Sequence, residues 1–358
     1  MSYSMLFWRS FTHWVGGMGV LVFLLTLIPL TGGSHMNLMK AESPGPSVTR
    51  LVPKVKSTAK ILYMIYIVLT IIEIFLLLFG GMPLFDSITL SLGTAGTGGF
   101  GIKNDSIAGY STYCQVIITI FMILFGINFN AYFLILIRKF RQAWESEEVR
   151  AYLLIIAAAT LAITFNVRGY FSSFAQAFQQ TIFQVASIIT TTGYATTNFD
   201  LWPEFSRVIL VLLMIVGASA GSTGGGMKLS RVMILAKSTY RAIARTVTPN
   251  SVHLIHLDGE IVEEDTVSAV ESFAIAYFMA AILTAVVLSI NGLSIGDGML
   301  AAISSLSNVG YGIDSNTFTM GVSGLNIISK AVLCFDMFLG RLEIFPMLVL
   351  FAPETWRK

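Results

Sequence analysis

Long, nearly uncharged apolar segments constrain this chain more than any other feature of its sequence. A helix needs about 20 mainly apolar residues to cross the ~30 Å hydrocarbon core of a membrane. A shorter apolar segment, Tyr152–Phe165, reaches this length if its flanks join it. The segments that reach it alone are Trp14–Leu30, Ile61–Gly80, Tyr113–Ile137, Val208–Leu235, Val267–Ile290 and Ile327–Phe351. The sequence therefore predicts an all-α integral membrane protein.

Composition agrees with this class. Of the 358 residues, 55% are hydrophobic and 12% are charged, whereas roughly a quarter of the residues of soluble domains are charged. The net charge of +2 is too small to indicate a nucleic-acid partner, and the basic clusters beside apolar segments are typical of membrane orientation. The expected surroundings are a lipid bilayer, with no nucleic acid bound.

Three further segments, Leu84–Ala95, Phe174–Ile189 and Ile295–Leu306, are too short or too polar to cross a membrane. Each ends in a turn with a glycine, and we align these glycines as Gly98, Gly193 and Gly310. The segments are best interpreted as re-entrant helices. Each forms, with the spans before and after it, one repeated unit, and such internal repeats suggest pseudo-symmetry around a shared pathway.

The distribution of charge predicts the orientation. Basic residues flank the ends of the spans opposite the glycine turns, and those ends should face the cytoplasm. They are Lys54, Lys56, Lys60, Arg138, Lys139, Arg141, Lys237, Arg241 and Arg245. The loops after the turns carry Asp105, Asp200, Glu204 and Asp314, and acidic loops at an outer mouth would attract cations.

The glycine turns have the composition of a cation filter. Irregular backbone at membrane depth must be buried in protein or line a wet cavity, and a K⁺ filter needs carbonyl oxygens that replace the ion's water. Glycine permits the unusual backbone angles, and the adjacent threonines add hydroxyl groups. The candidate filter residues are Gly96, Thr97, Gly98, Thr191, Thr192, Gly193, Asn308, Val309 and Gly310. Tyr194 and Tyr311 follow two of the glycines and could brace the filter.

Glycines also interrupt the span that contains Gly217–Ser230. Each glycine costs about 1 kcal/mol against alanine in a helix interior, so this stretch should be unwound and could plug the pathway. Polar groups there come from Ser222, Thr223 and Lys228. The candidate loop residues are Gly217, Gly221, Ser222, Thr223, Gly224, Gly225, Gly226 and Lys228.

Two ionisable residues fall inside predicted spans, where charge is costly and usually functional. Arg341 either faces the pathway or pairs with Asp336 or Glu343 near the cytoplasmic surface. For Glu73 we expect a hydrogen bond between helices rather than an ion site.

Several stretches together resemble the Trk/Ktr/HKT superfamily of potassium uptake proteins, most closely its TrkH-type membrane subunits. They are the three turns, "FWRSFTHWVGGMGVLVF", "ESPGPSV", "GASAGSTGGGMKLSR" and "GRLEIFP". The resemblance implies four helix–pore-helix–helix units around one pore. It divides this chain into the last helix of the first unit (1–35) and the second (36–142), third (143–250) and fourth (251–358) units. Tyr311 departs from the proline that the family often has there.

The resemblance also implies function and partners. K⁺, with Na⁺ as an alternative, would enter across the plasma membrane, gated by the glycine-rich loop and by Arg341 as a pore barrier. A homodimer with a cytoplasmic nucleotide-binding regulator of TrkA type is implied, docked on loops such as Arg138–Trp144 and Lys237–Thr248. No organic cofactor is expected in this chain.

Other classes of protein fit less well. No catalytic triad or paired carboxylates suit this topology, so we expect no enzyme. "GTGGFG" lacks the strand of a dinucleotide site, and His253 and His256 lack companion metal ligands. A Na⁺-coupled organic-solute symporter, which also uses broken helices, and a fragment that needs a separate first pore unit remain the alternatives.

Overall fold

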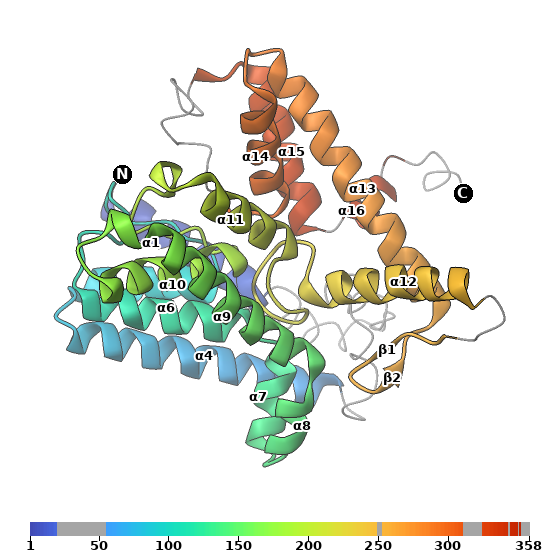
Figure 1. Cartoon of the computed structure of the whole chain (residues 1–358). Helices are drawn as coiled ribbons and strands as arrows, with labels where there is room; N and C mark the ends of the chain where they lie inside the picture. Colours follow the sequence, from blue (N-terminus) through green and yellow to red (C-terminus); the bar gives the residue numbers. More distant parts are fainter. Residues whose placement is uncertain (20–54, 249–252, 311–323, 343, 350, 352–358) are drawn as a thin grey trace.

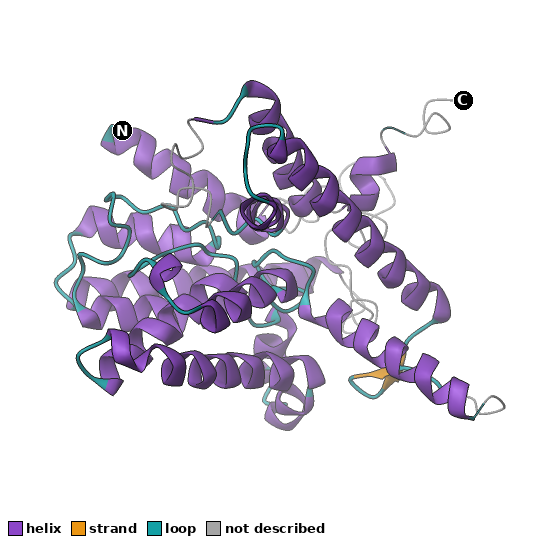
Figure 2. Cartoon of the chain, turned by 45° about the horizontal axis from the view of Figure 1, so that its top comes forward, coloured by secondary structure: helices purple, strands orange, loops and turns teal. Residues whose placement is uncertain are grey.

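The computed structural model describes residues 1–19, 55–248, 253–310, 324–342, 344–349 and 351. The described part is almost entirely helical, with one two-stranded antiparallel hairpin (Figure 1; Figure 2). In chain order the elements are α1 (Tyr3–Trp14), η1 (Val15–Gly19), α4 (Val55–Phe79), α5 (Leu84–Ala95), α6 (Thr112–Gly126), α7 (Phe129–Leu136), α8 (Phe140–Glu145), α9 (Glu147–Val167), η3 (Arg168–Tyr170), α10 (Phe174–Ile189), η4 (Phe199–Leu201), α11 (Glu204–Val216), α12 (Leu229–Val247), β1 (His256–Leu257), β2 (Glu260–Ile261), α13 (Glu264–Ser289), α14 (Ile295–Leu306), α15 (Ile327–Arg341) and α16 (Ile344–Val349).

The three short helices α5, α10 and α14 have the bounds expected from the sequence. Each packs between the helices that precede and follow it: α5 between α4 and α6, α10 between α9 and α11, and α14 between α13 and α15. Ser173 and Ser294 cap the starts of α10 and α14 by accepting a backbone N–H, as N-cap residues do. The repeated helix–short helix–helix unit is therefore present three times.

Within the described residues, three single helices are long and apolar enough to cross a membrane, namely Lys60–Phe79 within α4, Glu147–Tyr170 and Glu264–Ser289. They confirm the spans expected at Ile61–Gly80 and Val267–Ile290, and the short segment Tyr152–Phe165 does join its flanks. Of the expected span Trp14–Leu30, only the residues to Gly19 are described, and the rest lies outside the described residues.

Two other expected spans are interrupted. Val208–Leu235 divides into α11 and α12, which are joined by non-helical residues 217–228, as the glycines predict. Ile327–Phe351, expected as one span, contains α15 and the short α16 instead.

The span expected over Tyr113–Ile137 is bent: α6 and α7 meet there at 90°, and the two helices together are long and apolar enough to cross a membrane. Ile127 is extended, with φ −78° and ψ 147°, and the side chain of Asn128 accepts the Asn130 N–H at 3.0 Å to start α7. A local asparagine cap competes with helix continuation. Hydropathy does not register such a corner, because both sides of it are apolar.

Many apolar side chains are exposed on the outside of the fold, and many polar side chains are buried inside it beside the apolar core clusters. Ile71, Phe75 and Phe79 of α4 are exposed. Polar residues that are fully buried include Ser87, Thr89, Ser91 and Thr94 of α5, Thr181, Gln184 and Ser187 of α10, and Ser304 and Ser305 of α14. Soluble proteins show the opposite distribution. The structure is that of a membrane protein with many buried polar side chains.

Gly340 lets α15 approach the end of α14, since a Cβ at this position would overlap the carbonyl oxygen of Leu306. Gly340→Ala should lower the stability by roughly 1–3 kcal/mol, the usual cost of overpacking. The measurement is the thermal unfolding midpoint of the detergent-solubilised protein. Gly298→Ala, whose nearest neighbour would be 3.4 Å away, is the matched control and should leave the midpoint unchanged or higher. Equal midpoints for the two variants would contradict the packing described here.

Candidate pore and gate

The short helices α5, α10 and α14 all end in the same hydrogen-bonded turn. Their backbone N–H groups at Gly98, Thr192 and Val309 donate to carbonyls five residues earlier, at 2.7, 2.9 and 2.9 Å. The residues just before these donors lie in the left-handed region: Thr97 has φ 54°, Thr191 φ 58° and Asn308 φ 58°. This is the Schellman turn that usually carries glycine. Non-glycine residues there store roughly 1–3 kcal/mol of strain each, and such strain clusters at functional sites.

This shared turn corrects the alignment of the second unit by one residue. In each turn, a second residue with positive φ lies two positions after the left-handed residue. In the three units this residue is Gly99, Gly193 and Gly310, with φ of 59°, 86° and 73°. Gly99, not Gly98, therefore corresponds to Gly193 and Gly310. The run of glycines around Thr97 hid the register. The aromatic residue after the glycine, Phe100 in this unit, could have revealed it.

The non-helical segments that follow the turns lie side by side. A Cβ on Gly99 would overlap the carbonyl oxygen of Thr192, and a Cβ on Gly193 would overlap that of Val309. Only glycine allows both the positive φ and this close approach. The segment after the turn of α5 therefore lies against the segment after α10, which in turn lies against the segment after α14.

Gly96 and Gly98 also lie close to α1. A Cβ on Gly96 would lie 2.8 Å from the carbonyl oxygen of His13, and a Cβ on Gly98 would lie 2.5 Å from the His13 ring. These two glycines allow α1 to pack against the turn of the second unit.

Tyr194, the aromatic residue after Gly193, is hydrogen-bonded to α5. It is fully buried, and its hydroxyl donates to the carbonyl of Leu90 in α5 at 3.0 Å. Its own carbonyl accepts a hydrogen bond from Ser187 at 2.6 Å. The third unit is thus fastened to the second through one side chain.

The unwound stretch 217–228 lies against the turns of all three units. Thr97 donates its hydroxyl to the carbonyl of Thr223 at 3.0 Å, and the Thr191 hydroxyl accepts the Gly225 N–H at 2.6 Å. A Cβ on Gly225 would lie 2.5 Å from the carbonyl oxygen of Ser307. We call residues 217–228 the intramembrane loop.

Arg341 and Lys228 both bond to this loop. Arg341 donates to the carbonyl of Gly16 at 2.6 Å and to that of Thr223 at 3.4 Å. Lys228, itself at φ 74°, donates to the carbonyl of Gly224. Arg341 therefore links α15 to the loop and to η1.

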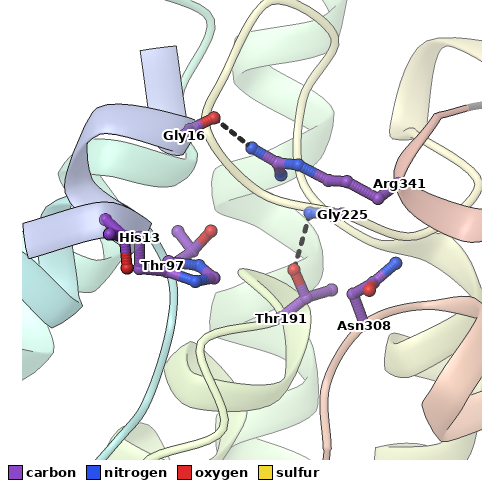
Figure 3. A pocket seen from close by; sticks show the side chains of 8 residues that line it. His13, Gly16, Thr97, Thr191, Gly225, Asn308 and Arg341 are labelled. Atoms are coloured by element: carbon purple, nitrogen blue, oxygen red, sulfur yellow. Dashed lines mark hydrogen bonds between the residues drawn. The ribbon is translucent and has the colours of Figure 1, made fainter. Parts of the chain in front are cut away.

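A cavity of about 280 Å³ lies between the three turns, the intramembrane loop and Arg341. Figure 3 shows Thr97, Thr191 and Asn308 at its edge, with Arg341 reaching across it to Gly16. The lining residues are Thr12, His13, Gly16, Thr97, Thr191, Gly225, Asn308 and Arg341. Sequence reasoning missed Thr12, His13 and Gly16. The motif "FWRSFTHWVGG" contains them, but nothing in its pattern says which face of the helix is inward.

Glu73 of α4 is fully buried, and its carboxylate lies beside the Thr94 side chain of the neighbouring helix α5. The Thr94 hydroxyl donates to the Leu90 carbonyl at 2.9 Å. The described residues contain no group of three metal-ligating side chains, His253 and His256 included.

The bond from Gly225 to Thr191 should hold the intramembrane loop in place. Thr191→Val keeps the shape but leaves a buried N–H without its acceptor, a loss of about 1–3 kcal/mol. Hydrogen exchange at the Gly225 amide should therefore be faster in this variant. Thr191→Ser keeps the hydroxyl and should exchange as the wild type does. If Val and Ser behaved alike, the hydroxyl would not anchor the loop.

Comparison with known proteins shows the family of this chain. The family model "TrkH: Cation transport protein" matches residues 1–358. The Trk system potassium uptake protein TrkH of Escherichia coli K12 is 34% identical over all of this chain and 75% of its own length, and TrkG of the same strain is 30% identical over 98% and 73%. The crystal structure of the potassium transporter TrkH from Vibrio parahaemolyticus superposes with a TM-score of 0.86 at 31% identity, over 100% of this chain and 74% of that one. The chain belongs to the TrkH family of cation transport proteins.

Proposed function

We propose that this protein takes up K⁺ across the plasma membrane through the centre that its three turns surround. The observation that carries the proposal is the shared geometry of these turns. Each of the three turns follows the carboxyl end of a short helix, which carries partial negative charge. At Gly99 and at Gly193, the segment after one turn lies against a backbone carbonyl of the next segment. Carbonyl oxygens held in this way replace the water of a cation. The relatives named as potassium uptake proteins support K⁺ over Na⁺.

We propose Thr97, Gly98, Gly99, Thr191, Thr192, Gly193, Asn308, Val309 and Gly310 as the filter residues, with Gly96 as a packing position. The three short helices end at one cavity, so the units share one orientation toward the pathway. A symporter for organic solutes would instead have inverted repeats. No observation here favours that alternative.

The intramembrane loop is the proposed gate. Its residues Thr223 and Gly225 bond directly to filter-turn threonines, so an ion that leaves the filter would meet the loop. Arg341 would close the path in two ways, by placing a positive charge at the cavity and by holding the Thr223 carbonyl. Lys228 adds a second cation beside the loop.

Assembly is proposed on the same basis. A homodimer and a cytoplasmic nucleotide-binding regulator of TrkA type would complete the transport system. The regulator would dock on Arg138–Trp144 and Lys237–Thr248, where Phe140, Trp144, Tyr240 and Val247 are exposed beside basic residues. We retain the division into units at 1–35, 36–142, 143–250 and 251–358 and expect no catalytic activity or organic cofactor in this chain.

Uptake of K⁺ tests the filter. In cells that lack their own K⁺ importers, the protein expressed from its complete gene with its regulator should restore growth at low K⁺. Gly99→Ser and Gly193→Ser should each reduce uptake roughly tenfold or more, since a loss of only 1.4 kcal/mol is a factor of ten. Gly81→Ser is the control, because Gly81 also has positive φ but no neighbour within 4 Å. A reduction by Gly81→Ser equal to the other two would refute the filter assignment.

Substitution of Arg341 tests the gate. Arg341→Ala removes the charge and the bonds to Gly16 and Thr223, and should raise K⁺ leak without the regulator by about tenfold. Arg341→Gln removes the charge but keeps a donor, so its leak separates the two roles. A leak near that of the wild type assigns the effect to hydrogen bonding, and a leak near that of Ala assigns it to charge. No leak in either variant would exclude Arg341 from the gate.

A further inference from the structure

Glu148, in the first turn of α9, is a buried carboxylate that sequence reasoning did not single out. Its exposed fraction is 3%. One carboxylate oxygen accepts the Ala220 N–H of the intramembrane loop at 2.7 Å, and the other accepts the Asn128 side-chain amide at 3.1 Å. A buried carboxylate is costly unless hydrogen bonds satisfy it, and bonds to an ionised acceptor are roughly twice as strong as neutral ones. Glu148 thus joins two irregular backbone segments.

Backbone hydrogen bonds also join the intramembrane loop to the corner between α6 and α7. The Phe129 N–H donates to the carbonyl of Gly221 at 3.0 Å, and the Ser219 N–H donates to that of Gly126 at 3.1 Å. The loop is therefore held at two places. Residues 219–221 bind the corner between α6 and α7, whereas residues 223–225 bind the filter turns. Glu148 is the buried carboxyl side chain at the first of these places.

Glu147, the residue before Glu148, connects the same turn of α9 to the cytoplasmic hairpin β1–β2. Asp258, in the hairpin turn, accepts the Glu147 N–H at 2.5 Å and the Ser146 hydroxyl at 3.3 Å. Ser146 makes no cap bond of its own, so Asp258 supplies the N-terminal cap of α9. Lys237 of α12 donates to Glu147 and, at 2.6 Å, to the His256 carbonyl.

We propose that Glu148 is a positioning residue for the gate, which holds the intramembrane loop closed, and that Asp258 sets the position of the helix turn that carries it. This inference rests on the proposed gating role of the loop. Residues 147 and 148 are consecutive, so a displacement of the hairpin moves the loop's anchor with it. A regulator that binds the cytoplasmic face could act on the loop through this turn.

Two readouts on the full-length protein test the role of Glu148. The first is leak of radioactive Rb⁺ into proteoliposomes without the regulator, and the second is hydrogen exchange of the amides of residues 219–221. Glu148→Ala should raise the leak about tenfold and speed exchange. Glu148→Gln keeps an oxygen for the Ala220 N–H but offers no second acceptor for Asn128, so it should fall between Ala and wild type. Thermal midpoints report any general loss of stability.

Glu145→Gln is the matched control, because Glu145 is exposed and pairs with Arg141 on the surface. It should leave leak and exchange unchanged. If Glu148→Ala does not fold, Glu148→Gln carries the test. Wild-type leak and wild-type exchange in the folded Glu148 variants would overturn the proposal. If the wild type itself carries no Rb⁺ with its regulator, the proposed function fails, and exchange alone then decides whether Glu148 holds the loop.

Asp258 needs its own pair of variants. Its φ is 53°, so Asp258→Gly removes the carboxylate without backbone strain, and Asp258→Asn keeps an acceptor and tolerates the same angle. Asp258→Gly should speed exchange both at the start of α9 and at residues 219–221, whereas Asp258→Asn, which keeps one acceptor for the Glu147 N–H but loses the second for the Ser146 hydroxyl, should fall between Gly and wild type. Faster exchange confined to the start of α9 would make Asp258 a helix cap only and would overturn its coupling to the loop.

Discussion

Irregular backbone at membrane depth is the constraint on which the rest of this structure depends. Every N–H and C=O that leaves a helix there needs a partner within the protein, because lipid offers none. The chain leaves helical geometry at the three turns, at the α6–α7 corner and along the intramembrane loop. These segments satisfy one another: the loop bonds to the turns through Thr97 and Thr191 and to the corner through Phe129 and Ser219.

This mutual satisfaction explains why glycine and hydroxyl residues gather at the centre. Glycine at Gly99 and Gly193 lets one strand lie against the carbonyls of the next. Threonine supplies a hydroxyl that can donate, as at Thr97, or accept, as at Thr191. The surrounding helices then need only apolar outer faces, and the exposed Phe75 and Phe79 of α4 show one. The polar groups that we propose for transport therefore also satisfy the irregular backbone of the fold.

The same reasoning applies to the proposed gate. A loop that closes a pathway must be held in place and yet be releasable. Several of the bonds that hold this loop are single hydrogen bonds from separate elements, such as those of Arg341, Thr191 and Glu148. Each bond contributes little alone, since a net hydrogen bond is worth about 1 kcal/mol. Small shifts of the helices that carry these side chains can therefore change the loop's stability.

The sequence by itself determined the membrane class, the three repeated units, the bounds of α5, α10 and α14, and the break after Val216. These features depend on local composition: apolar length, serine caps and glycine clusters act within one or two helical turns. The sequence also placed Arg341 and the loop near one pathway, through motifs rather than geometry. Its error at Gly98 was local too, since the second unit has adjacent glycines that fit either register.

Only the tertiary structure decided which groups meet. A hydropathy profile does not reveal the corner at Asn128, because the residues on both sides of it are apolar. The position of Thr12, His13 and Gly16 at the cavity depends on how α1 packs. Glu148 reads in the sequence as one acid in a charged stretch, yet it is buried against a loop 72 residues away. A residue's partners in space follow from the packing of helices distant in the chain, and that information is not contained in any local pattern.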